Sequence, residues 1–412
     1  MGLISHRDWL ATLLVAAALV ACQSSKSGGA ADGINRSPVV SRYDLANRCF
    51  ALKANGAYVL SNATGFIANG SDANSAERFY MKPAGLGRYI FYTSGSALMT
   101  GSGTAVTAAA TPADGADITV SGDNGRYTAT SLGLPLALDG AKQLVLGGTP
   151  ATLTFEPAGA CSIYPEMPVG IDAPTFKNAI GKPVIGFSEV HSHMGMSSEM
   201  SDGSGNVGPS AGGVLYGQPI NRFGVVEALG SCEAMHGPNG TLSAENIILD
   251  QNPTETHDTQ GWPSFIDWPK DDSFLHQQMY YKWIERAYKA GLRTMTIHGT
   301  SIEALCNIAA ASYGDKMAEC GDMEVGTAQV RYLYDIEKYV DAQQGGPGKG
   351  WFRIVKDPTE ARSVIADGKL AVIPGLEFSN VFHCRVQFLP DGSETSDCTK
   401  ESIDREIDEA WN

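Results

Sequence analysis

The chain has 412 residues, of which 43% are hydrophobic, and is therefore long enough for two or three domains with substantial cores. Its formal net charge of −15 argues against nucleic acid and against anionic membrane surfaces as partners. The charge leaves the class of substrate open.

Residues 1–21 are predicted to form a signal peptide. The apolar run at 9–20 has signal-sequence length and is too short for a permanent membrane span. It ends in Leu19-Val20-Ala21-Cys22, which resembles the lipobox of bacterial lipoproteins and implies a lipid on Cys22. Gln23 after the cysteine resembles lipoproteins of the outer membrane, so we expect a lipid-anchored protein of the bacterial cell envelope. The alternative is an ordinary signal peptide cut near the same point.

Residues 22–41 are rich in Ser, Gly and Ala and are predicted to be a flexible tether.

Export permits disulfides. Of 8 cysteines, all except Cys22 are available, and Cys232 is left over if the remaining six pair by position. The candidate pairs are Cys49 with Cys161, Cys306 with Cys320, and Cys384 with Cys398, although the sequence leaves the connectivity open.

Residues 42–164 are predicted to form an all-β module, because short apolar runs alternate with Gly, Asn, Asp and Ser. A weak internal repeat opens three blocks of about forty residues at Arg48-Cys-Phe, Arg88-Tyr-Ile and Arg126-Tyr-Thr. Three such blocks resemble a β-trefoil, a fold known mostly for binding sugars or proteins. A small sandwich is the alternative. The resemblance implies a glycan or protein ligand for this module.

A proline-rich linker at 165–183 leads to a segment, 184–412, in which strands and helices alternate. Four strand–helix units are about half of an eight-stranded barrel. We therefore expect an α/β, TIM-barrel-like hydrolase domain that appears truncated to its first half. The expected strands end at His191, His298, Val355 and Glu377.

Potential metal ligands fall at the ends of these strands. His191 and His193 are one residue apart, so both imidazoles point to one side of a strand, and Glu377 ends the fourth strand. Two imidazoles and a carboxylate suit zinc or a similar divalent ion. A carboxylate can also bridge two ions about 3.5–4 Å apart. His298 is either a substrate-binding residue facing the same pocket or a core or rim histidine.

The run from Arg353 to Glu377 resembles the membrane dipeptidase family of the amidohydrolase superfamily, in which a short helix ending in Gly-Lys and an apolar strand deliver a bridging Glu. The resemblance implies a (β/α)-barrel, one or two zinc ions and hydrolysis of an amide bond. His191 and His193 match the first-strand pair, although the dipeptidases have His-x-Asp there. The family's further ligands come from strands after the bridging Glu, where this sequence ends.

Two functions are consistent with these patterns. The first is an exported, lipid-anchored metal-dependent hydrolase that cleaves an amide or peptide bond of a small molecule or peptide. The second is a surface binding lipoprotein with an inactive half-barrel. Under the first hypothesis, we expect the isolated chain to bind zinc but to hydrolyse substrates poorly, because later ligands are missing.

Overall fold

The computed structural model describes residues 34–172, 178–196, 199–201, 207–209, 215–243, 257–268, 275–303, 307 and 320–411. The predicted signal peptide with Cys22, and Cys306, lie outside these residues. Among the helices that are described, none is both long and apolar enough to cross a membrane.

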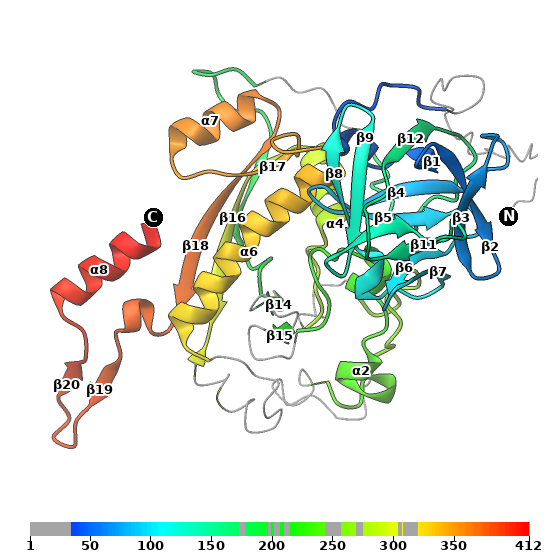
Figure 1. Cartoon of the computed structure of the whole chain (residues 1–412). Helices are drawn as coiled ribbons and strands as arrows, with labels where there is room; N and C mark the ends of the chain where they lie inside the picture. The colour runs from blue at the N-terminus through cyan, green and yellow to red at the C-terminus, as the bar shows by residue number, and fades with distance from the viewer. Residues whose placement is uncertain are drawn as a thin grey trace, which may run out of the picture. The chain divides into compact units, whose positions relative to one another are not determined.

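Residues 49–157 form antiparallel β-strands (Figure 1). The strands are β1 (Cys49–Ala54), β2 (Ala57–Asn62), β3 (Gly65–Gly70), β4 (Arg78–Gly85), β5 (Arg88–Thr93), β6 (Leu98–Ser102), β7 (Ala105–Ala109), β8 (Ile118–Asp123), β9 (Arg126–Ser131), β10 (Leu134–Leu138), β11 (Leu144–Leu146) and β12 (Leu153–Pro157). Two 3-10 helices, η1 (Arg42–Leu45) and η2 (Asp114–Ala116), accompany them. Pairing runs in a closed ring of nine strands, β9–β10–β11–β7–β6–β5–β4–β1–β12 and back to β9. This part of the chain is therefore a closed β-barrel.

Local sequence explains the hairpins and the core of this barrel. Asn55 and Gly56, between β1 and β2, both have positive φ (49° and 87°), as the tight turn of a two-residue hairpin requires. Phe50 and Leu52, two residues apart in β1, both enter the buried core. A disulfide joins Cys49 to Cys161, with the two Cα atoms 5.7 Å apart, and so links the first strand to the chain beyond the last.

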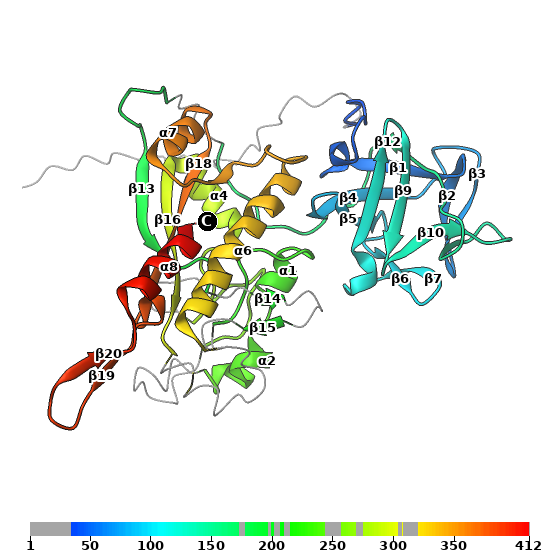
Figure 2. The ribbon, with the colours of Figure 1, turned by 60° about the vertical axis from the view of Figure 1, so that its left-hand side comes forward.

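A separate sheet of four parallel strands follows. It consists of β13 (Phe187–Ser192), β16 (Leu292–Ser301), β18 (Leu370–Phe378) and β17 (Phe352–Ile354), paired in that order. Figures 1 and 2 show the long helix α6 (Asp322–Gln343) lying along β16 and β18. Its Leu333 and Ile336 pack in one core with Ile297 and Val372 from the sheet.

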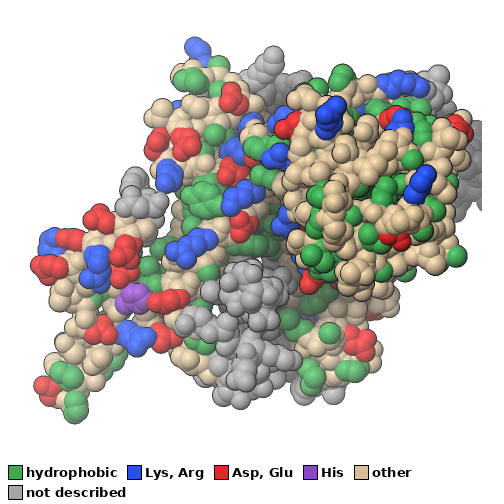
Figure 3. All heavy atoms as spheres, in the orientation of Figure 1, with side chains coloured by type: hydrophobic (Ala, Val, Ile, Leu, Met, Phe, Trp, Pro, Cys, Tyr) green, Lys and Arg blue, Asp and Glu red, His purple; other side chains and the backbone are tan. Residues whose placement is uncertain are grey.

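Further helices and hairpins surround this sheet. They are α1 (Val225–Ala228), α2 (Glu233–His236), η4 (Pro238–Gly240), α4 (Tyr281–Ala290), α7 (Pro358–Ala366), η6 (Val381–His383) and α8 (Lys400–Trp411), with the hairpins β14 (Glu199–Ser201)–β15 (Val207–Pro209) and β19 (Val386–Phe388)–β20 (Glu394–Ser396). The helix α7 begins at a side-chain cap: Asp357 accepts hydrogen bonds from the backbone N–H groups of Thr359 and Glu360, and Pro358 occupies the first turn. Figure 3 shows acidic and basic side chains side by side over α8, a strongly polar helix.

The predicted fold class, a β-trefoil-like module followed by a truncated TIM-barrel-like hydrolase domain, is wrong. The described residues hold a closed β-barrel and a separate parallel sheet, with few helices. In a TIM barrel, consecutive strands are neighbours. Here β18 lies between β16 and β17, and the edge strands β13 and β17 do not pair with each other. The strand order is not that of a barrel, so the inference that half of a barrel is missing is wrong as well.

Candidate metal centre

Three neighbouring parallel strands carry potential metal ligands at one edge of the sheet. His191 lies in β13, and His193 follows that strand directly. His298 lies near the end of β16 and Glu377 near the end of β18. Thr300 of β16 pairs with Glu377, so these two strands end level with each other. Carboxyl ends of parallel strands meet at one edge of a sheet, where open α/β sheets bind ligands.

The donor atoms of three of these residues form a compact triangle. The Nε2 atom of His191 lies 3.0 Å from Oε2 of Glu377 and 3.2 Å from Nε2 of His193. The third side, from Nε2 of His193 to Oε2 of Glu377, measures 3.4 Å. Ligand atoms about 2.0–2.1 Å from a tetrahedral ion lie about 3.3 Å from one another. The triangle therefore has the dimensions of one face of a zinc coordination tetrahedron.

A backbone carbonyl orients the ring of His193. Its Nδ1 lies 3.3 Å from the carbonyl oxygen of His298. Because a carbonyl oxygen can only accept a hydrogen bond, Nδ1 carries the proton in this contact. The lone pair of the neutral ring is then on Nε2, which faces His191 and Glu377. This contact is of the kind that fixes the tautomer of metal-binding histidines.

His298 is a further potential ligand. Donor atoms of His191, His298 and Glu377 all lie within 4.8 Å of one another. Its Nδ1 is buried and lacks a hydrogen-bond partner among the described residues. Burial, and then the neighbouring His191 and His193, lower the pKa of His298, while Glu377 acts in the opposite direction. An imidazole whose nitrogen has no hydrogen-bond partner among the described residues can serve as a metal ligand.

The triangle is open to solvent. The side chains of His191 and Glu377 are 56% and 50% exposed, and that of His193 is 27% exposed. Structural zinc sites are closed by four protein ligands, whereas catalytic sites keep one position open for water or substrate. The exposure and the small number of ligands both match an open site.

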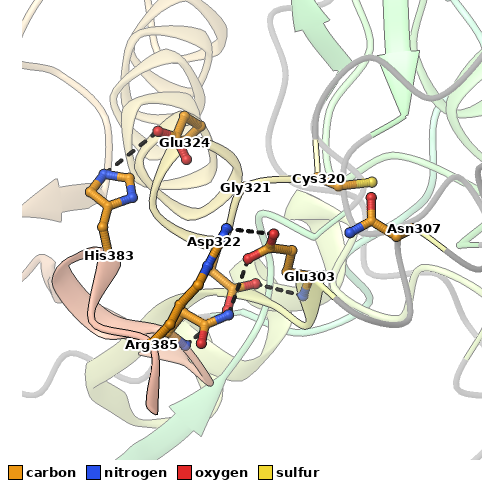
Figure 4. Close-up of a pocket in the computed structure, with 9 residues that line it drawn as sticks. Glu303, Asn307, Cys320, Gly321, Asp322, Glu324, His383 and Arg385 are labelled. Atoms are coloured by element: carbon orange, nitrogen blue, oxygen red, sulfur yellow. Dashed lines mark hydrogen bonds and ion pairs between the residues drawn. The ribbon is translucent and has the colours of Figure 1, made fainter. Parts of the chain in front are cut away.

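A polar cavity of about 320 Å³ lies among the segments that follow β16 and β18 (Figure 4). Glu303, Glu324, His383 and Arg385 contribute to its lining. Arg385 donates to Glu303 at 2.6 Å, and His383 lies 3.6 Å from Glu324. The cavity thus offers groups of both charges at the carboxyl edge of the sheet.

The buried carboxylate of Asp322 holds this edge together. It accepts hydrogen bonds from the backbone N–H of Glu303 (2.7 Å), the hydroxyl of Ser379 (2.8 Å) and the backbone N–H of Asn380 (3.0 Å). Asp322 starts α6, Glu303 follows β16, and the other two residues follow β18. One side chain therefore fixes the segments beyond both strands to the beginning of the helix.

The structure also shows where the cysteines of the predicted disulfides lie. Cys384 and Cys398 are joined by a disulfide, and Cys320 is disulfide-bonded. Cys306 and Cys22 lie outside the described residues. Cys232 is buried and free.

The sequence interpretation missed a second group of potential ligands, formed by Cys232, His236, His257 and His276, whose donor atoms lie within 4.8 Å of one another. Cys232 and His236 lie on the helical turn of α2, whereas His257 and His276 lie outside helices and strands, so no strand or helix period brings all four together. One signal was available: Cys232 and His236 are four residues apart, the spacing of neighbours on a helical turn. The chain therefore gathers side chains that can hold a divalent metal ion.

No protein-family model and no curated protein matches the chain. Several solved structures resemble a part of it, among them the following two. A salivary protein from Culex quinquefasciatus of the "Cysteins and Tryptophan-Rich" family is 12% identical, with a TM-score of 0.25, over 28% of this chain and 97% of that one. A structure described as SeviL bound to asialo-GM1 saccharide is 17% identical, with a TM-score of 0.24, over 27% of this chain and 98% of that one. These scores are too low to indicate a shared function.

Proposed function

We propose that the chain is a metal-dependent hydrolase in which His191, His193 and Glu377 hold a divalent ion. The observation that supports this most is the triangle of donor atoms with sides of 3.0, 3.2 and 3.4 Å. Zinc is the ion that suits two imidazoles and a carboxylate in tetrahedral geometry. A second ion is compatible with the proposal, because a carboxylate can bridge two ions about 3.5–4 Å apart and His298 lies beside the triangle.

The bound ion would supply polarisation of a carbonyl group and a nucleophilic water at neutral pH. The residues of the chain have other tasks. The carbonyl of His298 orients the His193 ring, and the negative charge of Glu377 offsets the charge of the ion. The exposed side of the triangle leaves room for a substrate to approach.

We infer an amide or peptide bond of a small molecule or peptide as the target. The support for this class is the resemblance of the run ending in Glu377 to the membrane dipeptidases. The first strand carries a second histidine instead of the aspartate of those enzymes, so a specificity for dipeptides does not follow from the resemblance.

The decisive experiment measures hydrolysis by the full chain. Metal-free protein would receive zinc and then a panel of dipeptides and N-acyl amino acids. We expect zinc-dependent hydrolysis that is lost in His193→Ala and Glu377→Gln and retained in Glu394→Gln, which changes an exposed carboxylate of β20. Zinc binding without hydrolysis of any panel member would overturn the proposal. It would favour a surface binding protein whose β-barrel takes a glycan or protein ligand.

We further propose that the protein is anchored to the cell envelope by lipid on Cys22. Cys22→Ser should move the protein from the membrane fraction to the soluble fraction. Mass spectrometry of the mature wild-type protein is the direct measurement. An unmodified Cys22 in a membrane-free product would show that the segment is not a lipoprotein signal.

A further inference from the structure

The group formed by Cys232, His236, His257 and His276 has the geometry of a closed metal site. Sγ of Cys232 and Nδ1 of His236 each lie 3.3 Å from Nε2 of His257. The planes of the three rings are nearly perpendicular in every pair, at 88–90°. In a tetrahedral zinc site, nitrogen and sulfur ligands lie about 3.3–3.6 Å from one another. The observed spacings and ring angles are those of donors that converge on one point.

Burial distinguishes this group from the open triangle. Cys232 is fully buried, His236 and His276 are each 2% exposed, and His257 is half-buried. Buried polar groups need partners, and one metal ion can bind all four of these nitrogen and sulfur atoms at once. Three of the four side chains are thus almost fully enclosed, which favours a site in which all four ligands come from protein, as in structural zinc sites.

The surrounding chain is shaped to hold these side chains. A single helical turn places His236 over Cys232, with the N–H of His236 donating to the Cys232 carbonyl at 2.8 Å. Trp268 stacks on His276, with centroids 4.9 Å apart. Gly240 packs against His257, and a Cβ atom there would lie 2.5 Å from its Nδ1. The segments at 232–236, 257 and 276 are thus held so that the four side chains face one another.

A catalytic cysteine–histidine pair is the alternative explanation for the contact between Cys232 and His257. Nucleophilic cysteines are accessible and have lowered pKa values. Cys232 is fully buried, so a substrate has no access to its thiol. Such a thiol is a poor nucleophile, whereas a coordinating metal ion deprotonates the thiol directly.

We propose that Cys232, His236, His257 and His276 bind one structural zinc ion. The donor set of one thiolate and three imidazoles suits zinc, and the buried position excludes substrate. The ion would cross-link the helical turn at 232–236 with residues 257 and 276, which lie outside helices and strands. This site is independent of the hydrolase proposal, because it shares no residue with the triangle at the sheet edge.

The test uses the full wild-type chain loaded with cobalt in place of zinc. Cysteine coordination gives a near-ultraviolet thiolate-to-cobalt charge-transfer band, which His/carboxylate coordination at the triangle lacks. We expect this band in the wild-type protein and in His193→Ala, and its loss in Cys232→Ser. Zinc content measured by mass spectrometry should fall by about one ion per chain in Cys232→Ser. Glu394→Gln, at an exposed residue of β20, is the control for His276→Asn, and only the latter should lose zinc.

The wild-type spectrum keeps the test decisive even if a variant fails to fold. A cobalt-loaded wild-type protein without the charge-transfer band would overturn the site. An equal zinc content in folded Cys232→Ser and wild-type protein would overturn it as well. Failure of the hydrolase proposal has a different signature, namely zinc bound at Cys232 with no metal-dependent hydrolysis.

Discussion

Nε2 of His191 lies 3.0 Å from Oε2 of Glu377, although β16 separates the strands that carry the two residues. Strands two places apart in a sheet are about 9–10 Å apart. Because β16 continues to Ser301, past the level of both residues, the two side chains meet across this strand, beside the ring of His298. His298 of that strand supplies the carbonyl that orients His193, so all three strands contribute to one arrangement.

Removing a donor from the triangle should weaken zinc binding at this site. Glu377→Gln keeps the shape of the side chain but removes its charge, and His193→Ala removes one nitrogen. We expect each to lower the affinity by more than about 100-fold, since changes around a site already cost 10–100-fold. Competition with a chromophoric chelator measures this effect. Glu394→Gln serves as the control, because this carboxylate is exposed in β20. An affinity in Glu377→Gln equal to that of wild type would remove Glu377 from the site.

Gly375 makes room for the ring of His298. A Cβ atom at this position would lie 2.6 Å from Cδ2 of His298, so the ring must move in Gly375→Ala. We expect the affinity for zinc at the triangle to fall about 10–100-fold without loss of the fold. Gly140→Ala is the matched control, because nothing lies within 4 Å of its added Cβ. Equal zinc affinity in the two variants would show that His298 does not support the site.

The positions of the site residues followed from local patterns. The two-residue period of a strand placed His191 and His193 together, and the position of Glu377 at a strand end brought it to the same edge. The order of strands did not follow, because apolar runs mark a strand without saying which strand lies beside it. The insertion of β18 between β16 and β17 is set by tertiary packing against α6. The predicted strands were therefore close to the observed ones, but the barrel inferred from them was wrong.

The group of Cys232, His236, His257 and His276 could not be predicted from such patterns, for a related reason. Its ligands His257 and His276 lie in segments without helix or strand, so no period in the sequence relates them to Cys232. Only the spacing of Cys232 and His236 carried a signal. A metal site of this kind becomes visible only when the backbone has brought its segments together.

Lys82 provides a test of a buried charge. Its Nζ donates to the Arg222 carbonyl at 2.6 Å and to the Tyr339 hydroxyl at 3.1 Å, and its side chain is buried. Burial lowers its pKa from 10.5 to about 7, although Glu166 and Asp117 act in the opposite direction. Between pH 7 and 10.5 the unfolded chain therefore binds more protons at this residue than the folded chain does.

The free energy of unfolding should consequently rise with pH in this window because of Lys82. The free energy of unfolding of the wild type, minus that of Lys82→Met, should therefore increase by up to about 1.4 kcal/mol per pH unit. Urea denaturation at several pH values between 7 and 10 measures it. Lys338→Met, at an exposed residue, should show no such slope. Parallel pH profiles for Lys82→Met and wild type would show that Lys82 stays charged in the folded protein.

Two of the disulfides, Cys49–Cys161 and Cys384–Cys398, should differ in their contributions to stability. Cys49 and Cys161 are separated by 112 residues, whereas Cys384 and Cys398 are separated by 14. In the chain-entropy model, loops of these sizes correspond to about 4.7 and about 3 kcal/mol. Double serine variants of each pair, compared by chemical denaturation, should therefore rank in this order. The reverse order would mean that strain or residual structure outweighs loop entropy.

Anomalous diffraction at the zinc edge, from crystals of the full chain grown with zinc, tests the central claim most directly. The proposal predicts an anomalous peak about 2.0–2.2 Å from Nε2 of His191, Nε2 of His193 and Oε2 of Glu377. A zinc-loaded crystal without a peak at this position, or with Glu377 turned away from the two histidines, would contradict it.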